Sequence, residues 1–261
     1  MNEIYQHFRA SEKYLIDSGF DWIEWVQRNY APYLTDFLNP RERHIIMSLV
    51  NQQEDIDVAF YGGLEDAESK RALLYPTYFI PTNEDYHITL FEIDYPSQFT
   101  NINHGQVLGT LMGAGLKREV IGDIITDGER VQFFAEDQLE DYIRMSVNRI
   151  GKNAVIIKPT AIENQVEPVE HYETRKISVS SLRLDVIIAG AFNFSRQIAK
   201  SLINSEKVKM NWEVINQAQI EVDFGDMISV RGYGRMRLIE LNGESRKGKL
   251  QLTISKLSNK R

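Results

Sequence analysis

Apolar side chains recur at three- and four-residue intervals in the first part of the chain, as at Leu15, Trp22, Trp25 and Val26. Such spacing places them on one face of a helix. Pro32 and Pro40 interrupt the pattern. Because proline ends or kinks a helix, the first 55 residues are predicted to form short helices rather than one long helix.

The period changes after this helical part. Residues 56–61 alternate between apolar and polar side chains, which is typical of a strand. Gly62-Gly63 then marks a turn, and residues 64–74 are predicted to form a helix. Residues 1–80 therefore read as an N-terminal helical or α/β region.

Residues 81–160 follow the order β-α-β-β-α-β. The predicted strands are 87–93, 122–126, 130–134 and 153–158, and the predicted helices are 105–116 and 137–149. Asp127-Gly128 between two apolar runs is a strong hairpin signal. This order is that of ferredoxin-like and RNA-recognition-motif domains. The aromatic signature of the latter is absent, so Phe133 and Phe134 could stack on bases or simply belong to the core.

A polar, acidic segment without periodicity, residues 161–174, is predicted to be a linker. Two helices and several short strands are predicted beyond it, with a hairpin that turns at Asn242-Gly243. Ser195 can cap the second helix. The apolar faces expected to be buried consist of Leu184, Ile187, Ile188 and Ala191 in the first helix and of Ile198, Ala199, Leu202 and Ile203 in the second.

Charge is divided unevenly along the chain. The net charge is -7, but residues 1–174 hold 14 Lys+Arg against 29 Asp+Glu, whereas residues 175–261 hold 16 against 8. A basic module of this kind points to polyanion binding, because cations near phosphates release condensed counterions. Basic segments can also be merely solvated, so charge alone decides nothing.

Composition argues against several classes of protein. There is no cysteine, so disulfides, thiolate zinc sites and cysteine nucleophiles are excluded. No run approaches the roughly 18 apolar residues of a membrane helix, and the N-terminus lacks the features of a signal peptide, so a cytoplasmic protein without membrane contact is expected. No phosphate-loop spacing is present, and no cofactor is expected. No metal site is expected either, since none of the histidines lies in an HExxH motif: His7, His44, His87, His104 and His171.

One series of residues in the basic segment forms a motif. It consists of Arg183-Leu184-Asp185, Ser195-Arg196, Ala199, Leu202-Ile203, Val208, Asn211 and the run Gly225-Asp226-Met227-Ile228-Ser229-Val230. This series resembles the S-four RNA-binding domain, named for a small-subunit ribosomal protein. Glu206 stands where the motif usually has glycine. Since glycine there would adopt a positive φ at a helix end, the turn could be altered in this chain.

The resemblance extends to the YlmH family of bacterial S-four proteins. It rests on HGQVLGTLMGAGLKREVIGDI at 104–124, on Asn211-Trp212 after KVKM, and on the tail VRGYGRMRLIELNGESRKGKLQL. It implies an α+β chain in which the N-terminal region (1–80), the ferredoxin-like central domain (81–160) and the linker (161–174) precede an S-four domain (175–261) of a helix pair and a small sheet. It also implies attachment to the large ribosomal subunit, a part in rescuing stalled nascent-chain complexes, and an older link to cell division.

The candidate RNA-binding residues follow from side-chain chemistry. Arginine offers a planar fork and lysine a flexible point charge to phosphate, asparagine can bond a base edge or 2'-hydroxyl, and an aromatic ring can stack on a base. Trp212 could equally belong to the core. The S-four candidates are Arg183, Ser195, Arg196, Lys200, Lys207, Lys209, Asn211, Trp212, Arg231, Tyr233 and Arg235, and the central-domain candidates are His104, Lys117 and Arg118. The expected partners are ribosomal RNA, tRNA or both, and no DNA.

Two other functions compete with RNA binding alone. Residues 183–190, RLDVIIAG, resemble the pseudouridine-synthase motif R-L-D-x-x-[ST]-x-G, but Ile188 replaces the hydroxyl residue and the long catalytic domain is missing. The signatures of a tyrosyl-tRNA synthetase are also missing. No catalytic residue is therefore assigned. The second alternative is a protein-interaction module of the division machinery, which would use the acidic N-terminal half and need no RNA.

Overall fold

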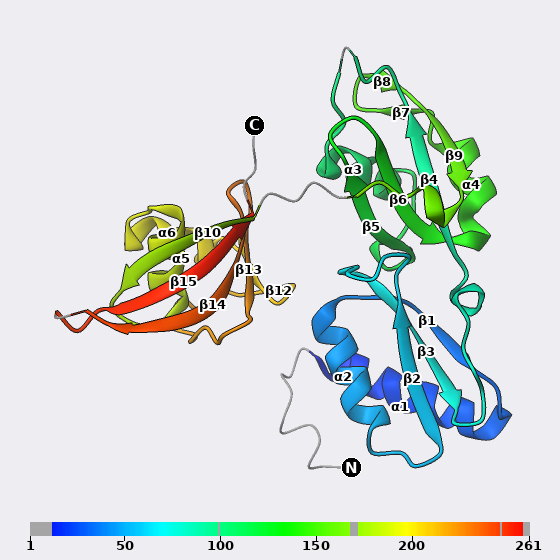
Figure 1. The fold of residues 1–261 in the computed structure, drawn as a ribbon, viewed down its shortest axis with the longest axis horizontal. Helices are drawn as coiled ribbons and strands as arrows, with labels where there is room; N and C mark the ends of the chain where they lie inside the picture. Colours follow the sequence, from blue (N-terminus) through cyan, green and yellow to red (C-terminus); the bar gives the residue numbers. More distant parts are fainter. Residues whose placement is uncertain (1–11, 99, 168–171, 246, 258–261) are drawn as a thin grey trace. The chain divides into compact units, whose positions relative to one another are not determined.

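The computed structural model describes residues 12–98, 100–167, 172–245 and 247–257. The chain divides into two compact units, residues 1–169 and 170–261 (Figure 1), and each is described by itself. Within the described residues, no helix is both long and apolar enough to cross a membrane.

The N-terminal part of the first unit packs two helices on a three-stranded sheet. Its elements are α1 (Lys13–Asn29), β1 (Tyr33–Leu38), α2 (Pro40–Val50), β2 (Ile56–Tyr61) and β3 (Lys70–Pro76), and the antiparallel strands lie in the order β1-β3-β2. The shared core includes Ile16, Ile23, Ile46, Leu49 and Leu74.

Two predictions for this part are wrong. Tyr33–Leu38 is a strand rather than helix, and the helix predicted over 64–74 does not exist, because β3 occupies its second half. Ala72, Leu73 and Leu74 have good helix propensity, but they lie in the central strand and are buried. Pairing with both neighbours overrides local propensity here, as tertiary context often does for short apolar runs.

The central part has the predicted element order with one addition. Its main elements are β4 (Ile88–Asp94), α3 (His104–Gly113), β5 (Ile121–Thr126), β6 (Val131–Glu136), α4 (Glu140–Ser146) and β9 (Ile156–Thr160), with short 3-10 turns at Asn83–Tyr86, Arg118–Val120 and Asp137–Leu139. The sheet order is β5-β6-β4-β9, antiparallel throughout. The predicted second helix ends early, at Ser146, and a small additional pair, β7 (Arg149–Ile150) and β8 (Asn153–Ala154), takes up the start of the predicted last strand.

Both faces of the central sheet are buried. Phe91 and Phe133 pack under α3 and α4 on one face, with Val107, Leu111 and Ile143. On the other face Phe134 packs with Phe37 of the N-terminal part. A Cβ atom on Gly63, whose φ is +89°, would lie 2.2 Å from the Phe134 ring. Phe133 and Phe134 are therefore core residues.

Polar contacts also join the two parts of the first unit. The Arg71 guanidinium donates to the backbone oxygens of Thr35, Tyr86 and His87 at 2.7 to 3.1 Å and lies 3.2 Å from the Glu136 carboxylate. Burial raises the pKa of Glu136, although the charge of Arg71 opposes the rise. Asp123 of β5 accepts hydrogen bonds from the backbone of residues 68 and 69.

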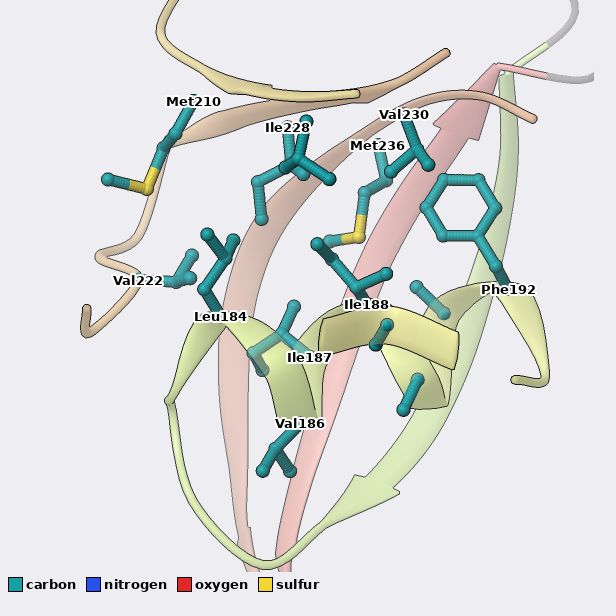
Figure 2. Packing of buried hydrophobic residues seen from close by; sticks show 14 of the residues in the cluster. Leu184, Val186, Ile187, Ile188, Phe192, Met210, Val222, Ile228, Val230 and Met236 are labelled. Carbon is teal, nitrogen blue, oxygen red and sulfur yellow. The ribbon is translucent and has the colours of Figure 1, made fainter. Parts of the chain in front are cut away.

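The second unit is a six-stranded antiparallel sheet with two helices. Its elements are β10 (Tyr172–Val179), α5 (Leu184–Phe192), α6 (Arg196–Asn204), β11 (Val208–Met210), β12 (Glu213–Val214), β13 (Met227–Val230), β14 (Gly234–Glu244) and β15 (Leu250–Leu257), and the sheet order is β10-β15-β14-β13-β11-β12. Figure 2 shows Leu184, Ile187 and Ile188 of α5 facing Ile228 and Met236 of the sheet.

Two further corrections concern loops. The segment 161–174 is only partly a linker, since a 3-10 turn spans Ile162–Asn164, Val166 is buried, and β10 begins at Tyr172. The hairpin predicted near Asn242-Gly243 exists, but both residues lie within β14, and the chain turns between Ser245 and Lys249 instead. Gly243 has a φ of +109° where the register with β15 shifts, so this pair forms an irregularity rather than the turn.

Candidate nucleic-acid interface

Three cations of α5 and α6 converge on one buried carboxylate. Asp185 is fully buried in the first turn of α5, and its Oδ1 and Oδ2 atoms accept from Arg183 Nε at 3.1 Å and Arg196 Nη2 at 2.9 Å. Lys200 Nζ lies 4.0 Å from Oδ2. The side chains of Arg183, Arg196 and Lys200 remain 38%, 53% and 51% exposed, so they can also contact a ligand. We call these three cations and Asp185 the helix-side cluster.

Asp185 remains ionised despite its burial. Desolvation raises the pKa of its carboxyl group, but hydrogen bonds from Arg183 and Arg196 and their charges outweigh this effect, so its pKa lies below the usual value. The backbone N–H groups of Leu184 and Asp185 also bond Ile220 and Ala218. The sequence placed Asp185 in the S-four motif without giving its side chain a role, whereas the structure makes it the anchor of the candidate cations. A charged residue on an otherwise apolar helix face was the available signal.

Helix α6 presents its cations beside a capped N-terminus. Ser195 Oγ accepts from the Ile198 N–H at 3.3 Å, which confirms the predicted cap. Ala199 is buried as predicted, but Ile198 is 47% exposed, so its assignment to the buried face was wrong. The buried stripe is centred on Ala199, Leu202 and Ile203, and Ile198 falls outside it.

The end of α6 keeps the turn that a glycine would form, so the alteration that Glu206 suggested does not occur. Glu206 has a φ of 56°, in the left-handed region that favours glycine. The Glu206 and Lys207 N–H groups bond Ile203 and Leu202, which completes a Schellman motif. Lys207 is exposed, and its carbonyl oxygen accepts from the Arg231 N–H at 2.8 Å, so the helix end contacts the turn that contains Arg231.

Asn211 and Trp212 form the two-residue turn between β11 and β12. Both have positive φ, 49° and 69°, as in a type I' turn. The Asn211 side chain donates to Asp226 at 2.6 Å and accepts from the Met227 N–H at 3.0 Å, so it already has structural partners. Trp212 is half-buried. A bulky residue in this conformation is uncommon and is a reason to suspect function.

The turn between β13 and β14 adds an aromatic cluster. The Tyr233 ring meets the Phe194 ring edge-on at 4.7 Å between centroids, and Phe194 stacks with Phe192 at 5.8 Å. Lys256 Nζ lies 4.6 Å from the Phe192 centroid. Tyr233 is half-exposed next to the residue preceding the Ser195 cap, so a base could stack near the helix-side cluster.

The remaining S-four candidates lie elsewhere. Lys209 lies between Val208 and Met210, which point into the core, and Arg235 precedes the buried Met236. Because strand side chains alternate between faces, both cations point to the sheet face opposite the helices. The structure therefore places the predicted cations on two sides of the sheet, some on the side of the helices and Lys209 and Arg235 on the opposite face. Their RNA-binding role stays a prediction.

The central-domain candidates do not form a cluster either. His104 is the exposed first residue of α3, and Lys117 lies exposed beyond the other end of this helix, whose length is about 14 Å. The Arg118 guanidinium donates to the Ile121 carbonyl and to Ser69 Oγ, so it is engaged within the protein. Among the residues described by the structure, no group of three or more acidic or histidine side chains is arranged to hold a metal ion.

Comparison with known families covers most of the chain. Residues 11–79 match the model "YlmH, N-terminal", residues 81–164 match "Putative RNA-binding domain in YlmH", and residues 182–228 match the "S4 domain", which is the S-four domain. A Bacillus subtilis (strain 168) protein, "Ribosome-associated protein quality control protein P2", is 38% identical over 256 residues, covering 98% of this chain and 99% of that protein. The chain belongs to the YlmH family. A solved structure, "Cell division protein ylmH from Streptococcus pneumoniae", matches with a TM-score of 0.55 and 32% identity, over 62% of this chain and 99% of that chain.

For this YlmH-family chain, the matched models indicate RNA as the ligand class, and one of them covers the central domain. RNA-recognition motifs bind RNA with aromatic side chains on the open face of their sheet. Here that face carries Phe134 and is covered by Phe37, Leu64 and Val166. This sheet face is therefore not open for stacking on bases.

Proposed function

We propose that this YlmH-family protein binds structured RNA on the large ribosomal subunit through the helix-side cluster, without catalysing a reaction. The main support for this proposal is the convergence of Arg183, Arg196 and Lys200 on the buried Asp185. One ionised carboxylate orients three partly exposed cations, and the surplus positive charge suits phosphate. The B. subtilis relative is named as ribosome-associated, which supports the ribosome as the place of binding.

Finer parts of the proposal rest on the same observations. The target is ribosomal RNA, tRNA or both, and the role is in rescuing stalled nascent-chain complexes in the cytoplasm, which the relative's quality-control name supports. The proposed domain boundaries lie after residues 80, 160 and 174. The linker between the last two boundaries is shorter than predicted, because part of it is folded. The sheet order β9-β4-β6-β5 supports a ferredoxin-like central domain.

The geometry of Asp185 argues against the pseudouridine-synthase alternative. A catalytic acid must reach the substrate base, but this carboxylate is fully buried and bound by two arginines. Ile188, at the hydroxyl position of the near-match, is also buried in the core. Incubation with ribosomal RNA and tRNA should yield no new pseudouridine, and pseudouridine that disappears with Asp185→Asn would contradict the proposal.

The decisive experiment is co-sedimentation with purified large ribosomal subunits. Replacing Arg183, Arg196 and Lys200 by Ala would leave Asp185 buried without partners, so the test variant also carries Asp185→Asn. A Lys13→Ala, Lys152→Ala variant makes the same net charge change on the first unit. The quadruple variant should lose most binding, and each lost phosphate contact should reduce the slope of log affinity against log salt by about 0.9 for a duplex-like site. Wild-type co-sedimentation of a quadruple variant that circular dichroism shows to be folded would contradict the proposal.

A role in cell division is the second candidate, because the solved relative is described as a cell division protein. The quadruple variant separates the two functions. If it no longer binds ribosomes yet restores normal division to cells that lack the protein, division does not depend on RNA binding. If both are lost together, the division phenotype follows from translation.

A further inference from the structure

The S-four sheet has a second face, opposite the helices. Val208, Met210, Met236 and Leu238 point into the core beneath α5 and α6. Because side chains alternate along a strand, Lys209, Arg235 and Arg237 point to the other side. On β10, Ile177 and Val179 pack toward the core, so Lys176 points outward as well. We call this the outer sheet face.

The strand register aligns the cations of the outer sheet face into a band. Three neighbouring rows cross the strands, and each holds a cation and a hydroxyl group: Val214–Lys209–Ser229–Arg235, Met227–Arg237–Ser255–Thr174 and Lys176–Thr253–Glu240. Lys209, Arg237 and Lys176 are exposed, and Arg235 is half-buried. The band therefore runs diagonally from β11 to β10.

The spacing of the band suits a phosphate backbone. Neighbouring strands lie about 4.8 Å apart and successive rows about 6.7 Å apart, so Lys209 and Arg235 are about 10 Å apart at their backbones. Cations at such intervals along an extended face can contact neighbouring phosphates of one RNA strand. The hydroxyl groups of Ser229 and Ser255 can donate to phosphate oxygens between the cations.

Glu240, the acidic residue in these rows, does not cancel the positive charge of the band. The Glu240 carboxylate accepts hydrogen bonds from Asn242 at 2.8 Å and from Thr253 at 3.3 Å, at the end of the third row. Four cations thus stand against one carboxylate that has local partners. Val214 and the buried Met227 lie beside the cations, but charged and hydroxyl side chains make up most of these rows, which fits a polyanion better than the apolar centre of a protein interface.

We infer that the outer sheet face is a second RNA-binding site, which takes the phosphate backbone of an RNA segment separate from the one at the helix-side cluster. The sheet lies between the two groups of cations, so the S-four unit holds two RNA segments at once. This inference rests on the proposed function, because it assumes that the helix-side cluster binds RNA.

A bridging assay with the full chain tests the inference. The probe is an RNA hairpin with a stem of about 16 base pairs, the length that one double-stranded-RNA-binding domain spans. Binding of one fluorescent hairpin is measured first. One hairpin is then immobilised, and retention of a second, labelled hairpin by bound protein is recorded.

Three variants test the two faces of the S-four unit separately. The outer-face variant carries Lys176→Gln, Lys209→Gln and Arg237→Gln. The helix-side variant carries Arg196→Gln and Lys200→Gln and keeps Arg183 as a partner of Asp185. The control carries Lys13→Gln, Lys152→Gln and Lys158→Gln on the first unit, which matches the charge change of the outer-face variant.

The wild type and the control should retain the second hairpin. The outer-face variant should still bind one hairpin but lose at least tenfold of the bridging signal, and the helix-side variant should lose bridging as well. Bridging by a folded outer-face variant at the wild-type level would overturn the inference, as would single-hairpin binding by the wild type without bridging. Failure of the wild type to bind any hairpin would contradict the proposed function itself, and this first measurement reveals it separately.

Discussion

Each unit of the molecule contains arginines bound to a carboxylate, but the two sites differ in exposure. In the first unit the side chains of Arg71 and Glu136 are only 7% and 2% exposed, and the remaining donors of Arg71 bond backbone oxygens. In the second unit only the carboxylate of Asp185 is buried, and Arg183 and Arg196 extend into solvent. The closed pair connects two parts of a unit, whereas the open cluster keeps cations available.

The same contrast holds for the sheets. Neither face of the central sheet is available to a ligand, because Phe133 packs under helices and Phe134 against the N-terminal part. The S-four sheet is covered by helices on one face, and Lys209 and Arg237 lie exposed on the other. The central domain has thus used its sheet for assembly of the unit, and the S-four domain keeps cations on both of its sides.

The largest effect is expected from breaking the closed pair. Arg71→Met should lower the free energy of unfolding of the first unit by about 3 to 5 kcal/mol, because Glu136 remains buried without its charge partner. The double variant Arg71→Met, Glu136→Leu should recover much of this loss. Urea unfolding followed by tryptophan fluorescence measures both, and a double variant no more stable than the single one would mean that the backbone bonds of Arg71, not its ion pair, connect the two parts.

A smaller, pH-dependent effect is expected at the open cluster. The pKa of Asp185 is lowered in the folded state, so its stabilising contribution is present above the unfolded value near 3.9 and is lost as the pH falls through the folded pKa. Asp185→Asn should therefore cost roughly 1.5 to 3 kcal/mol at pH 7, the value of hydrogen bonds to a charged group. The difference from wild type should shrink below about pH 4. A difference in unfolding free energy that stays constant from pH 7 to pH 3 would show that ionisation of Asp185 is not the stabilising factor.

The smallest effect concerns the strained end of α6. Glu206→Gly should raise the free energy of unfolding by about 1 kcal/mol, because only glycine adopts a positive φ without steric cost. It should also strengthen RNA binding slightly, since a carboxylate leaves the neighbourhood of Lys207. Glu206→Ala is the matched control: it removes the same charge but keeps the strain. Equal stability of the two variants would mean that the backbone is not strained at this position.

Much of the architecture followed from local patterns. The Ser195 cap and the buried stripe of α6 at Ala199, Leu202 and Ile203 depend on contacts within a few residues, and the structure confirms both. The uneven division of charge is also a property of the sequence itself. Such features can be predicted because their physical causes, helix periodicity and capping, act over short distances along the chain.

Other features depended on partners distant in sequence. Residues 71–74 became a strand because β1 and β2 pair with both of its edges. Asn211 is occupied because Asp226 and Met227 lie beside it, and Phe134 is buried because Phe37 covers it. The sequence alone determined which residues carry the positive charge. Only the tertiary structure decided that Asp185 collects three of these cations while the sheet directs Lys209 and Arg235 to its opposite face, because the side of a sheet on which a residue lies depends on strand register and helix packing.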